Sequence, residues 1–325
     1  MKEKILELLK ASSDYVSGQD ICNQLGVSRT AVWKNMNALK QDGYEIDSVT
    51  NKGYRLISEP DILNEMRIRE YLHTKWMGKK IIYLPVTDST NTQAKKLGEE
   101  GAEHGTLVVT QCQTAGKGRR GRSWESPAGN VYFTFLLRPE VKVSRASMIT
   151  LVSALAMANA IEMVTKLKTQ IKWPNDVVAN GKKLCGILTE SSTDLEYINY
   201  VVVGIGINVN QTSFPEDIAD KASSLLLELG HSVNRGQVLG EFLNQFEKYY
   251  EIFEKTEDMS GLIEAYNEKL VNCGREVKII EKDRERILKA LGIDNDGGLV
   301  VENSEGERES IISGEVSVRG IYGYV

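Results

Sequence analysis

The most unusual segment of the sequence is QTAGKGRRGRSWESPAGN at 113–130. Between Gly116 and Arg122 it holds three glycines and no acidic residue, together with four cations: Lys117, Arg119, Arg120 and Arg122. The backbone N–H groups of a glycine loop and the forks of guanidinium groups can together close on a phosphate or a carboxylate. The segment therefore predicts an anion-binding loop, with a solvated surface loop as the plainer alternative.

Gly116, Gly118 and Gly121 also satisfy the G-x-G-x-x-G pattern of dinucleotide-binding folds. That fingerprint must open a helix, and an acidic residue must follow about twenty positions later. Here Ser-Trp-Glu-Ser-Pro follows at 123–127, and a strand is predicted after it. The context therefore argues against a dinucleotide site at this loop.

Three further segments hold groups that could complete an anion site. KWPND at 172–176, followed by KLCGIL at 183–188, brings a carboxylate and a lysine together around a turn, or simply reverses the chain. In GIGINVN at 204–210 the glycines fall within a predicted strand, where a ligand can approach closely or a bulge can form. In DSTN at 88–91 the hydroxyls can read a polar ligand or cap a helix.

The elements that must position these segments form three parts, of which 1–60 is the first. Ser17 and Ser28 are placed to cap two short helices that are joined through a turn at Gly26. Two β-rich runs then surround Asn51-Lys52-Gly53, which is a hairpin signal. This order predicts a winged helix-turn-helix.

Strands and helices alternate in the second part, 61–272, and predict a mixed α/β domain. The expected strands are 80–84, 106–111, 131–137, 183–189 and 200–208, and the expected helices are 91–100, 147–167, 236–255 and 260–270. The third part, 273–325, has short strand-like runs divided by turns, which predict a small SH3-like β barrel. The fold class expected for the whole chain is α+β multidomain.

Composition limits the function classes that the chain can belong to. The net charge of −5 argues against a protein that coats nucleic acid without specificity. The four cysteines are scattered without a CxxC pair, which fits neither a zinc site nor a disulfide framework. The most apolar window, 146–161, is too short to span a bilayer and predicts a buried helix. We expect a cytoplasmic protein with no membrane partner.

Taken together and in this order, DSTN, GKGRRGRSW, KWPND, KLCGIL and GIGINVN resemble the motifs of the biotin protein ligase family. With the flanking parts, the chain is similar over essentially its whole length to the bifunctional bacterial ligase and biotin-operon repressor. The resemblance implies that biotin and MgATP give biotinyl-5′-adenylate, and that a lysine of a biotin carboxyl carrier domain of acetyl-CoA carboxylase or a related carboxylase then takes the biotinyl group. It also implies an adenylate-bound homodimer that represses biotin genes at operator DNA.

The resemblance carries roles to individual residues. It makes Lys183, Arg119 and Asp176 the catalytic candidates, with Asp176 serving either Mg²⁺ or the lysine nucleophile. The biotin-binding candidates are Ser89, Thr90, Asn91, Gln113, Lys117, Arg119, Arg120, Arg122, Trp124, Lys183, Gly186, Gly204 and Gly206. The nucleotide-binding candidates are Arg119, Arg122, Trp124, Asn175, Asn208 and Arg319. Lys117 stands where the family often has arginine, so it keeps the charge but loses the bidentate fork.

In the first part, the predicted helix at 28–40 would enter the major groove. The DNA-contacting candidates are Ser28, Arg29, Thr30, Trp33, Lys34 and Asn37 on this helix, with Lys52 and Arg55 in the wing. Residues 1–60 hold eight basic and eight acidic side chains, so tight binding would need two copies on two half-sites. The alternatives are a ligase whose winged helix does not repress, a lipoate-type ligase, and a regulator that only senses the ligand.

Overall fold

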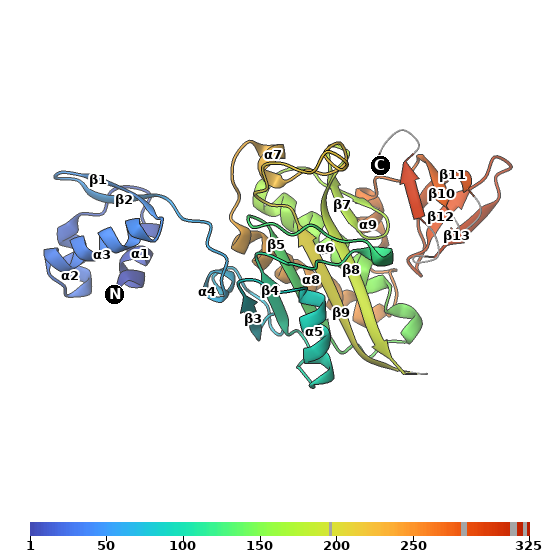
Figure 1. The fold of residues 1–325 in the computed structure, drawn as a ribbon, viewed down its shortest axis with the longest axis horizontal. Coiled ribbons are helices and arrows are strands. Elements are labelled where there is room, and N and C mark those ends of the chain that lie inside the picture. The colour runs from blue at the N-terminus through green and yellow to red at the C-terminus, as the bar shows by residue number, and fades with distance from the viewer. Residues whose placement is uncertain (195–196, 281–284, 313–316, 321–323) are drawn as a thin grey trace. The chain divides into compact units, whose positions relative to one another are not determined.

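The computed structural model describes residues 1–194, 197–280, 285–312, 317–320 and 324–325. Its contacts divide the chain into two compact units, Met1–Ile62 and Leu63–Val325 (Figure 1). Each unit has its own cluster of buried apolar side chains. A separate core is what allows a segment to fold as a domain.

Three helices and a β-hairpin make up the N-terminal unit. They are α1 (Lys2–Lys10), α2 (Gly18–Leu25), α3 (Arg29–Gln41), β1 (Glu45–Val49) and β2 (Gly53–Ser58). Ile5, Ile21, Val32 and Leu39 from the three helices are each at most 1% exposed and pack in one cluster. The helical spacing of these apolar residues therefore gives the unit its core.

The predicted helix caps of this unit are confirmed. The Oγ atoms of Ser17 and Ser28 accept hydrogen bonds of 3.0 and 3.2 Å from the backbone N–H groups of Asp20 and Ala31. Gly26 ends α2 at a φ of 65°, in the left-handed region. The two capped helices are thus joined by a tight glycine turn, as expected.

The hairpin turn also depends on a glycine. Gly53 has a φ of 116°, and a Cβ atom there would lie 2.1 Å from the carbonyl oxygen of Val16. Tyr54 then pairs with Val16 as an isolated antiparallel bridge. The close approach of these two backbones fixes the hairpin against the segment between α1 and α2.

A seven-stranded sheet forms the centre of the second unit. In spatial order its strands are β3 (Ile81–Leu84), β4 (Leu107–Thr110), β5 (Val131–Leu137), β9 (Ile198–Ile207), β8 (Lys182–Thr193), β7 (Asp176–Ala179) and β6 (Gln170–Lys172). β3 and β4 run parallel, whereas the five other neighbouring pairs are antiparallel. The sheet is therefore mixed, and together with the helices that pack on it forms an α/β domain, as predicted.

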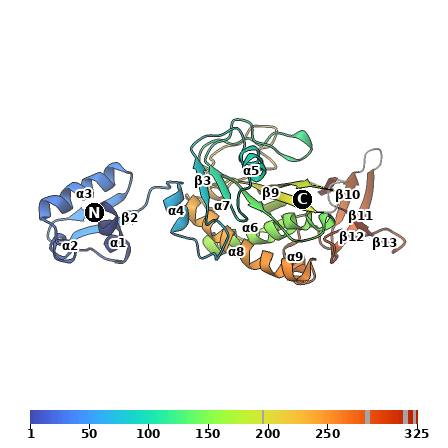
Figure 2. The same ribbon diagram turned by 90° about the horizontal axis from the view of Figure 1, so that it is seen from below.

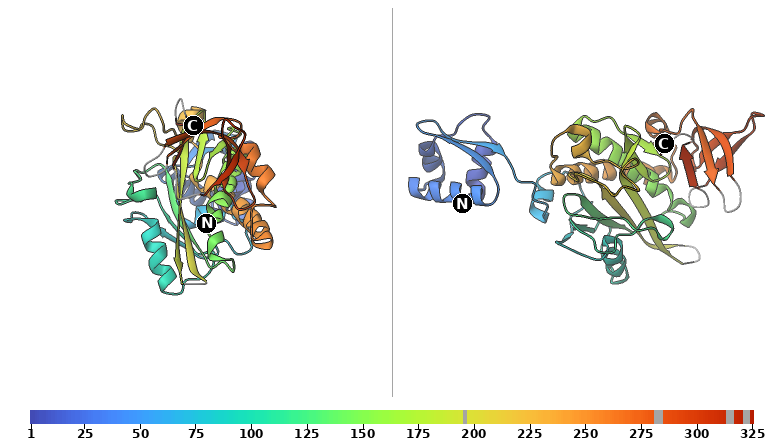
Figure 3. Two further views of the ribbon diagram at one scale, coloured as in Figure 1. Left: turned by 90° about the vertical axis from the view of Figure 1, so that its right-hand side faces the viewer. Right: turned by 45° about the horizontal axis from the view of Figure 1, so that its top comes forward.

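Helices cover both faces of this sheet (Figures 2 and 3). α5 (Thr90–Glu99) packs against β4, β5 and β9 on one face. α6 (Met148–Thr165) and α8 (Arg235–Thr256) pack together on the other face, where the ring of Phe242 of α8 meets that of Phe133 of β5 at an angle of 59°, with the ring centres 5.1 Å apart. Shorter helices are α4 (Glu65–Arg69), α7 (Leu225–Leu229) and α9 (Ile263–Lys269), and 3-10 turns lie at Arg119–Gly121 and Val143–Arg145.

The apolar helix is a core helix, as predicted. Val143–Thr165 is long and apolar enough to cross a membrane, but 72% of its most apolar window is buried inside the protein. It lies between the sheet and α8, so its apolar side chains are covered by the protein itself.

The C-terminal part is a β-sheet. Five antiparallel strands lie in the order β13-β12-β11-β10-β14, and they are β10 (Glu276–Ile280), β11 (Glu285–Ile293), β12 (Leu299–Glu302), β13 (Arg308–Ile311) and β14 (Ser317–Gly320). Val277, Leu299 and Val301 of this sheet are buried in the same apolar cluster as α6 and β5. The shared core explains why residues 63–325 form one compact unit.

Four short elements were not among the predicted ones, namely β6, β7, α4 and α7. β6 and β7 have three and four residues and flank the KWPND turn. α4 and α7 have five residues each. Segments of this length cover fewer than two periods of a hydrophobic pattern in a helix and at most two in a strand, which is too few for periodicity to detect them.

Candidate active site

Three strands bring small residues together on the face of the sheet that α5 covers. Gly206 of β9 pairs with Gly186 of β8 and with Tyr132 of β5, and Gly204 pairs with Leu188 and Thr134 in the next row. Because side chains alternate across a strand, all of these residues face the same side. The register therefore leaves a hollow above Gly186, Gly204 and Gly206.

Two side chains already approach these glycines closely. A Cβ atom on Gly206 would lie 2.5 Å from Nε1 of Trp124, and one on Gly186 would lie 2.7 Å from the same ring. A Cβ atom on Gly204 would lie 1.8 Å from Oδ1 of Asn91. The space at Gly204 thus holds the Asn91 amide, whereas the resemblance implied that this glycine admits biotin.

A chain of hydrogen bonds fixes the polar end of the hollow. Gln113 Oε1 accepts from the backbone N–H and the hydroxyl of Thr90, at 2.8 and 3.1 Å. The hydroxyl of Thr134 lies 2.8 Å from that of Thr90 and 2.7 Å from Oδ1 of Asn91. Ser89 is the N-cap residue of α5, but its hydroxyl makes no capping hydrogen bond. The Ser89 hydroxyl is therefore available to a ligand, while Thr90 and Asn91 are held in place.

Glu190 of β8 supports this end from below. Its carboxylate accepts hydrogen bonds from Nδ2 of Asn91 at 2.8 Å and from Nζ of Lys95 at 2.5 Å. Burial opposes the ionisation of Glu190, but these hydrogen bonds outweigh it and hold its pKa below the ordinary value. A charged Glu190 therefore orients the Asn91 amide.

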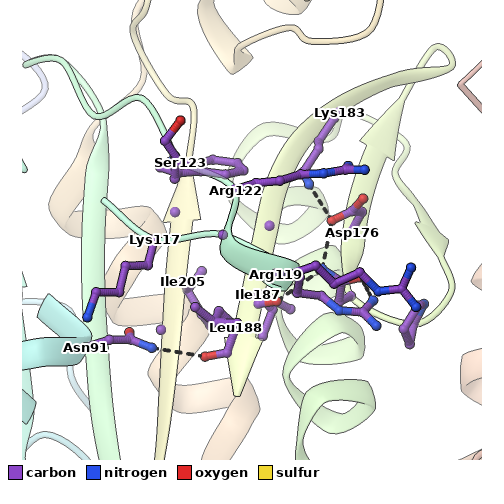
Figure 4. Close-up of a pocket in the computed structure, with 18 of the residues that line it drawn as sticks. Asn91, Lys117, Arg119, Arg122, Ser123, Asp176, Lys183, Ile187, Leu188 and Ile205 are labelled. Carbon is purple, nitrogen blue, oxygen red and sulfur yellow. Dashed lines mark hydrogen bonds and ion pairs between the residues drawn. The ribbon is translucent and has the colours of Figure 1, made fainter. Parts of the chain in front are cut away.

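The opposite end of the hollow is built around Asp176 (Figure 4). Its Oδ1 accepts from Nζ of Lys183 at 2.6 Å and from Nδ2 of Asn175 at 3.1 Å. Asn175 Oδ1 in turn accepts from Nη1 of Arg119 at 2.7 Å. The KWPND turn, strand β8 with Lys183, and the 116–122 loop with Arg119 therefore meet around the carboxylate of Asp176.

The lining of this pocket is strongly cationic. Its volume is about 490 Å³, and its charged residues are Lys117, Arg119, Arg120, Arg122, Lys172, Lys183, Lys221 and Asp176. In the described part of the lining, seven cations thus face a single carboxylate, in a chain whose net charge is −5. Concentrating one sign of charge in a hollow raises the local potential and favours a polyanionic ligand.

Members of the cationic loop point to both ends of the pocket. Lys117 donates to the Thr92 hydroxyl at 3.0 Å and thus lies toward α5, whereas Arg119 and Arg122 lie toward Asp176 (Figure 4). Burial lowers the pKa of Arg119, and the charge of Asp176 counteracts part of that effect. Arg120 has a φ of 57° and is exposed. A bulky residue in the left-handed region is strained, so this loop conformation is held at a cost.

The structure gathers most of the predicted site residues in this pocket. All thirteen biotin-binding candidates line it, as do Asn175 and Asp176. Asn208 does not line it: this residue is buried, and its Nδ2 donates to the backbone carbonyl of Ser223 at 3.0 Å. Arg319 lies in β14, but its side chain falls outside the described part of the structure.

Sequence reasoning missed several lining residues, among them Lys172, Lys221 and Tyr324. Lys172 stands inside the KWPND motif, so its position beside Asp176 could have been used as a signal. Lys221 and Tyr324 lie in no motif. They line the pocket because the tertiary fold brings the segment after β9 and the end of the C-terminal part next to it.

The described residues do not build a protein cage for a metal ion. No group of three or more His, Cys, Asp or Glu side chains gathers anywhere in them. Among the described residues that line the pocket, Asp176 is the only carboxylate, and both of its oxygens already accept hydrogen bonds or an ion pair. The described donors therefore form no all-protein cage; a single carboxylate suits an Mg²⁺ that keeps its waters and arrives with a phosphate ligand.

In the N-terminal unit, the predicted DNA-contacting residues occupy one helix and one turn. On α3, Arg29, Thr30, Trp33 and Lys34 are exposed, and Asn37 is half-buried. Ser28 instead serves as the N-cap of α3. Lys52 lies in the hairpin turn and is exposed, and Arg55 lies in β2 and is half-buried.

Hydrogen bonds and a ring hold several of these cations in place. Arg29 donates through Nε and Nη2 to Oε1 of Gln19 at 3.2 and 2.9 Å. The charges of Lys52 and Arg55 lie 5.7 and 4.8 Å from the centre of the Tyr15 ring. These side chains are thus oriented before any nucleic acid arrives.

Comparison with known proteins accounts for all parts of the chain. Residues 83–208 match the model of the biotin/lipoate A/B protein ligase family, residues 2–55 match an HTH domain, and residues 273–319 match the biotin protein ligase C-terminal domain. A Bacillus spizizenii protein named bifunctional ligase/repressor BirA is 40% identical, over 94% of this chain and 95% of its own. This chain belongs to the BirA family. The Escherichia coli protein of the same name is 32% identical, over 97% of this chain and 96% of its own.

A solved structure extends the BirA-family likeness to three dimensions. The biotin protein ligase from Aquifex aeolicus, in complex with biotin and ATP, aligns with a TM-score of 0.66 and 34% identity. The alignment covers 74% of this chain and 99% of that one. The chain is thus an α+β multidomain member of the BirA family, with a helix-turn-helix domain, a biotin ligase fold and a β-sheet part in that order.

Proposed function

We propose that this chain is an ATP-dependent ligase that attaches biotin to a biotin carboxyl carrier protein, and that it also represses transcription. The ligase activity is supported by the arrangement of groups in the pocket. One end has fixed hydroxyl and amide groups around small residues, and Lys183, Arg119 and Arg122 lie at the other end, around Asp176 (Figure 4). That division suits a ligand with a neutral polar ring at one end and an anion at the other, beside a triphosphate.

In the first half-reaction, a carboxylate oxygen of biotin attacks the α-phosphorus of ATP. The bond between that phosphorus and the bridging oxygen breaks, and pyrophosphate leaves. Both reactants are anions, so preorganised cations lower the barrier by offsetting their repulsion. We assign this role to Lys183, Arg119 and Arg122. The Ser89, Thr90 and Gln113 groups would hydrogen-bond the ureido ring of biotin, and Trp124 would cover it.

In the second half-reaction, the acceptor lysine attacks the acyl carbon of biotinyl-5′-adenylate. The bond from that carbon to the AMP oxygen breaks, and the amine gives up a proton. Asp176 holds Lys183 at 2.6 Å, which supports a role in orienting that lysine at both steps. We assign Mg²⁺ to ATP as part of the MgATP substrate, since the described donors form no cage for it.

ATP–pyrophosphate exchange tests the ligase proposal. We expect exchange in the purified chain when biotin is added, and none with lipoate or without an acid. Transfer of labelled biotin to a carrier domain then tests the second half-reaction. Absence of exchange with every acid would support a regulator that only senses its ligand, and exchange with lipoate would support a lipoate-type ligase.

The helix-turn-helix domain carries the repressor part of the proposal. Exposed Arg29, Trp33 and Lys34 lie on one capped helix, the geometry by which such domains read the major groove. We infer that binding of the adenylate orders the 116–122 loop, promotes a homodimer and so licenses operator binding. Sedimentation with and without biotinyl-5′-adenylate tests this coupling. A dimer population that does not respond to the adenylate would contradict it.

The finer features of the architecture belong to the same proposal. The β1–β2 hairpin would act as the wing, and the five-stranded C-terminal sheet would close into an SH3-like barrel. We place domain limits at 1–60, 61–272 and 273–325, supported for the last by a family match that begins at 273. The chain would act in the cytoplasm, where biotin-dependent carboxylases and operator DNA are both accessible.

A further inference from the structure

Gln19 links the two helices of the helix-turn-helix. It lies in the first turn of α2, and its Oε1 accepts hydrogen bonds from Nε and Nη2 of Arg29 at 3.2 and 2.9 Å. Its Nε2 donates to Oδ1 of Asn23, one turn further along α2, at 2.9 Å. Gln19 is not among the DNA-contacting residues predicted from the sequence. One amide thus joins α2 to the first residue of α3.

The chemistry of the two partners sets the direction of the Gln19 amide. An arginine side chain has only donors, so the amide oxygen must face Arg29 and the amide nitrogen must face away from it. The nitrogen then finds its acceptor in Oδ1 of Asn23. Both ends of the amide are therefore held, and Gln19 presents a fixed acceptor to Arg29.

These hydrogen bonds occupy one edge of the Arg29 guanidinium group. Nε and Nη2 form its side-on edge, and both donate to the same oxygen. Nη1 and the second proton of Nη2 form the end-on edge, and no group among the described residues accepts a hydrogen bond from Nη1. Because Arg29 is exposed, the end-on edge is open to a ligand.

A cleft lies beside this pair. It has a volume of about 450 Å³ and is formed by the start of α2, the start of α3 and the hairpin turn. Its described lining includes the two cations Arg29 and Lys52 and no acidic residue. A DNA phosphate group can enter such a cleft without repulsion while the recognition helix lies in the major groove. The surroundings of Arg29 therefore suit an approach by DNA.

We propose that Gln19 is a positioning residue that presents Arg29 end-on to a guanine of the operator. This inference rests on the proposed repressor function. A guanine offers two acceptors, O6 and N7, at its major-groove edge, and two parallel donors of a guanidinium group match them. An adenine has a donor in place of O6, so it opposes one of the two N–H groups. An arginine that is held in advance also loses less conformational freedom on binding.

A phosphate contact by Arg29 and a structural role of Gln19 would give different results. A phosphate carries no sequence information, so loss of a phosphate contact would weaken binding to every sequence alike and reduce its salt dependence. A structural role would lower the melting temperature together with the affinity. Only a guanine contact makes the preference for one base depend on Gln19.

The experiment measures binding of the full chain, with biotin and ATP present, to an operator selected from a random DNA pool. Fluorescence anisotropy compares the selected operator with versions in which a single guanine of one half-site is replaced by adenine. For the unchanged chain, we expect one guanine whose replacement weakens binding about tenfold or more. In Gln19→Leu, the same replacement should cost about threefold or less. The salt dependence of binding should not change, because no phosphate contact is lost.

Gln19→Glu is the conservative variant, because it keeps an acceptor for Arg29. Its preference for guanine should stay within about twofold of the unchanged chain, while its negative charge weakens binding to every sequence alike. Gln24→Leu is the matched control, since Gln24 is an exposed glutamine of the same helix and is absent from the described lining of the cleft. Both its affinity and its preference should be those of the unchanged chain. In the Arg29→Ala background, Gln19→Leu should alter the preference by less than about twofold, because the arginine that it positions is gone.

Two outcomes would overturn the proposal: an unchanged preference for guanine in Gln19→Leu, or a loss of affinity that is equal for all sequences. If Gln19→Leu does not fold, Gln19→Ser decides by the same comparison, since its short hydroxyl group cannot replace the amide. If the unchanged chain selects no sequence, the repressor function fails and the guanine contact fails with it. A selected operator whose recognition does not depend on Gln19 contradicts the guanine contact alone and leaves the repressor function standing.

Discussion

Seven lysine and arginine side chains face one carboxylate among the described residues of the pocket, whereas residues 1–60 hold eight basic and eight acidic side chains. In the N-terminal unit several cations have partners of their own. Arg55 lies 4.0 Å from Asp47, and Lys40 donates to the Ser48 hydroxyl at 3.0 Å. The pocket would bind the phosphates of ATP and the N-terminal unit those of DNA, yet of the two only the pocket has an excess of positive charge.

The difference shows two ways to bind an anion. A confined hollow with excess cations binds a small polyanion by itself, since its charges are already in place. An open helix face with balanced charge gains little from phosphates and must depend on base contacts and on a second copy. The same chain would thus bind its nucleotide as a monomer but its DNA as a pair.

The strongest test of this comparison removes a cation from the pocket. We expect Lys183→Ala to lower kcat/KM for adenylate formation about 10²- to 10³-fold, because Asp176 fixes this ammonium group beside the reacting atoms. Lys221→Ala is the control, since its side chain lines the same pocket but is 52% exposed. Exchange kinetics measure both, and equal losses would show that total charge matters more than placement.

The next test alters the shape of the pocket without altering its charge. Gly206→Ala places a methyl group 2.5 Å from Nε1 of Trp124, so the indole ring must move. We expect biotin binding to weaken about tenfold or more, as measured by calorimetric titration. Gly18→Ala in α2 is the control, because its methyl group meets no atom within 3.6 Å. Unchanged affinity in Gly206→Ala would mean that the ring is not part of the ligand site.

A third test addresses the N-terminal unit. We expect Arg29→Ala to weaken binding of an operator selected from a random DNA pool by about 1–3 kcal/mol, and to relax its sequence preference. Lys4→Ala, an exposed cation on α1, should leave both unchanged. Fluorescence anisotropy at several salt concentrations measures them. A loss in Arg29→Ala that is uniform over all sequences would reassign Arg29 to a phosphate contact.

The smallest expected effect is on the melting temperature, and it comes from Glu190, whose carboxylate holds the Asn91 amide. The pKa of Glu190 is lowered, so its contribution to stability is present above its ordinary value of 4.5 and is lost as the pH falls through the lowered value. Glu190→Gln should therefore melt about 2 °C lower at pH 7, and the difference should shrink at acidic pH. Glu99→Gln, an exposed residue of the same helix as Asn91, should melt normally. A difference independent of pH would exclude ionisation as the cause.

Motif segments could be placed from the sequence because each lies next to an element with a clear pattern. DSTN contains the first residues of α5, and GIGINVN begins in the last residues of β9, so both motifs could be placed with only local information. The caps at Ser17 and Ser28 were predictable for the same reason. Local patterns therefore made the motifs recognisable, whereas the roles of their residues came from the resemblance to the ligase family.

Contacts between distant parts of the chain could not be predicted in this way. Tyr324 is separated from Asp176 by 148 residues, and no period or spacing connects them. The Asn91 amide over Gly204 depends on the register of β9 and on the position of α5. Such placements follow from tertiary packing, which composition and periodicity do not encode.

Two hydrogen bonds donated by Trp173 bear on how the protein should unfold when it is heated. Trp173, inside KWPND, donates its backbone N–H to Asn272 and its indole N–H to the carbonyl of Gly297, both at 3.1 Å. The turn that carries Asn175 and Asp176 is thereby tied to the start of the C-terminal sheet. A bound ligand should stabilise residues 63–325 as one block, by about 2.7 kcal/mol at a hundred times its Kd. A heating scan of the whole chain should then show two heat-absorption peaks, of which biotin and ATP move only the one that belongs to this block.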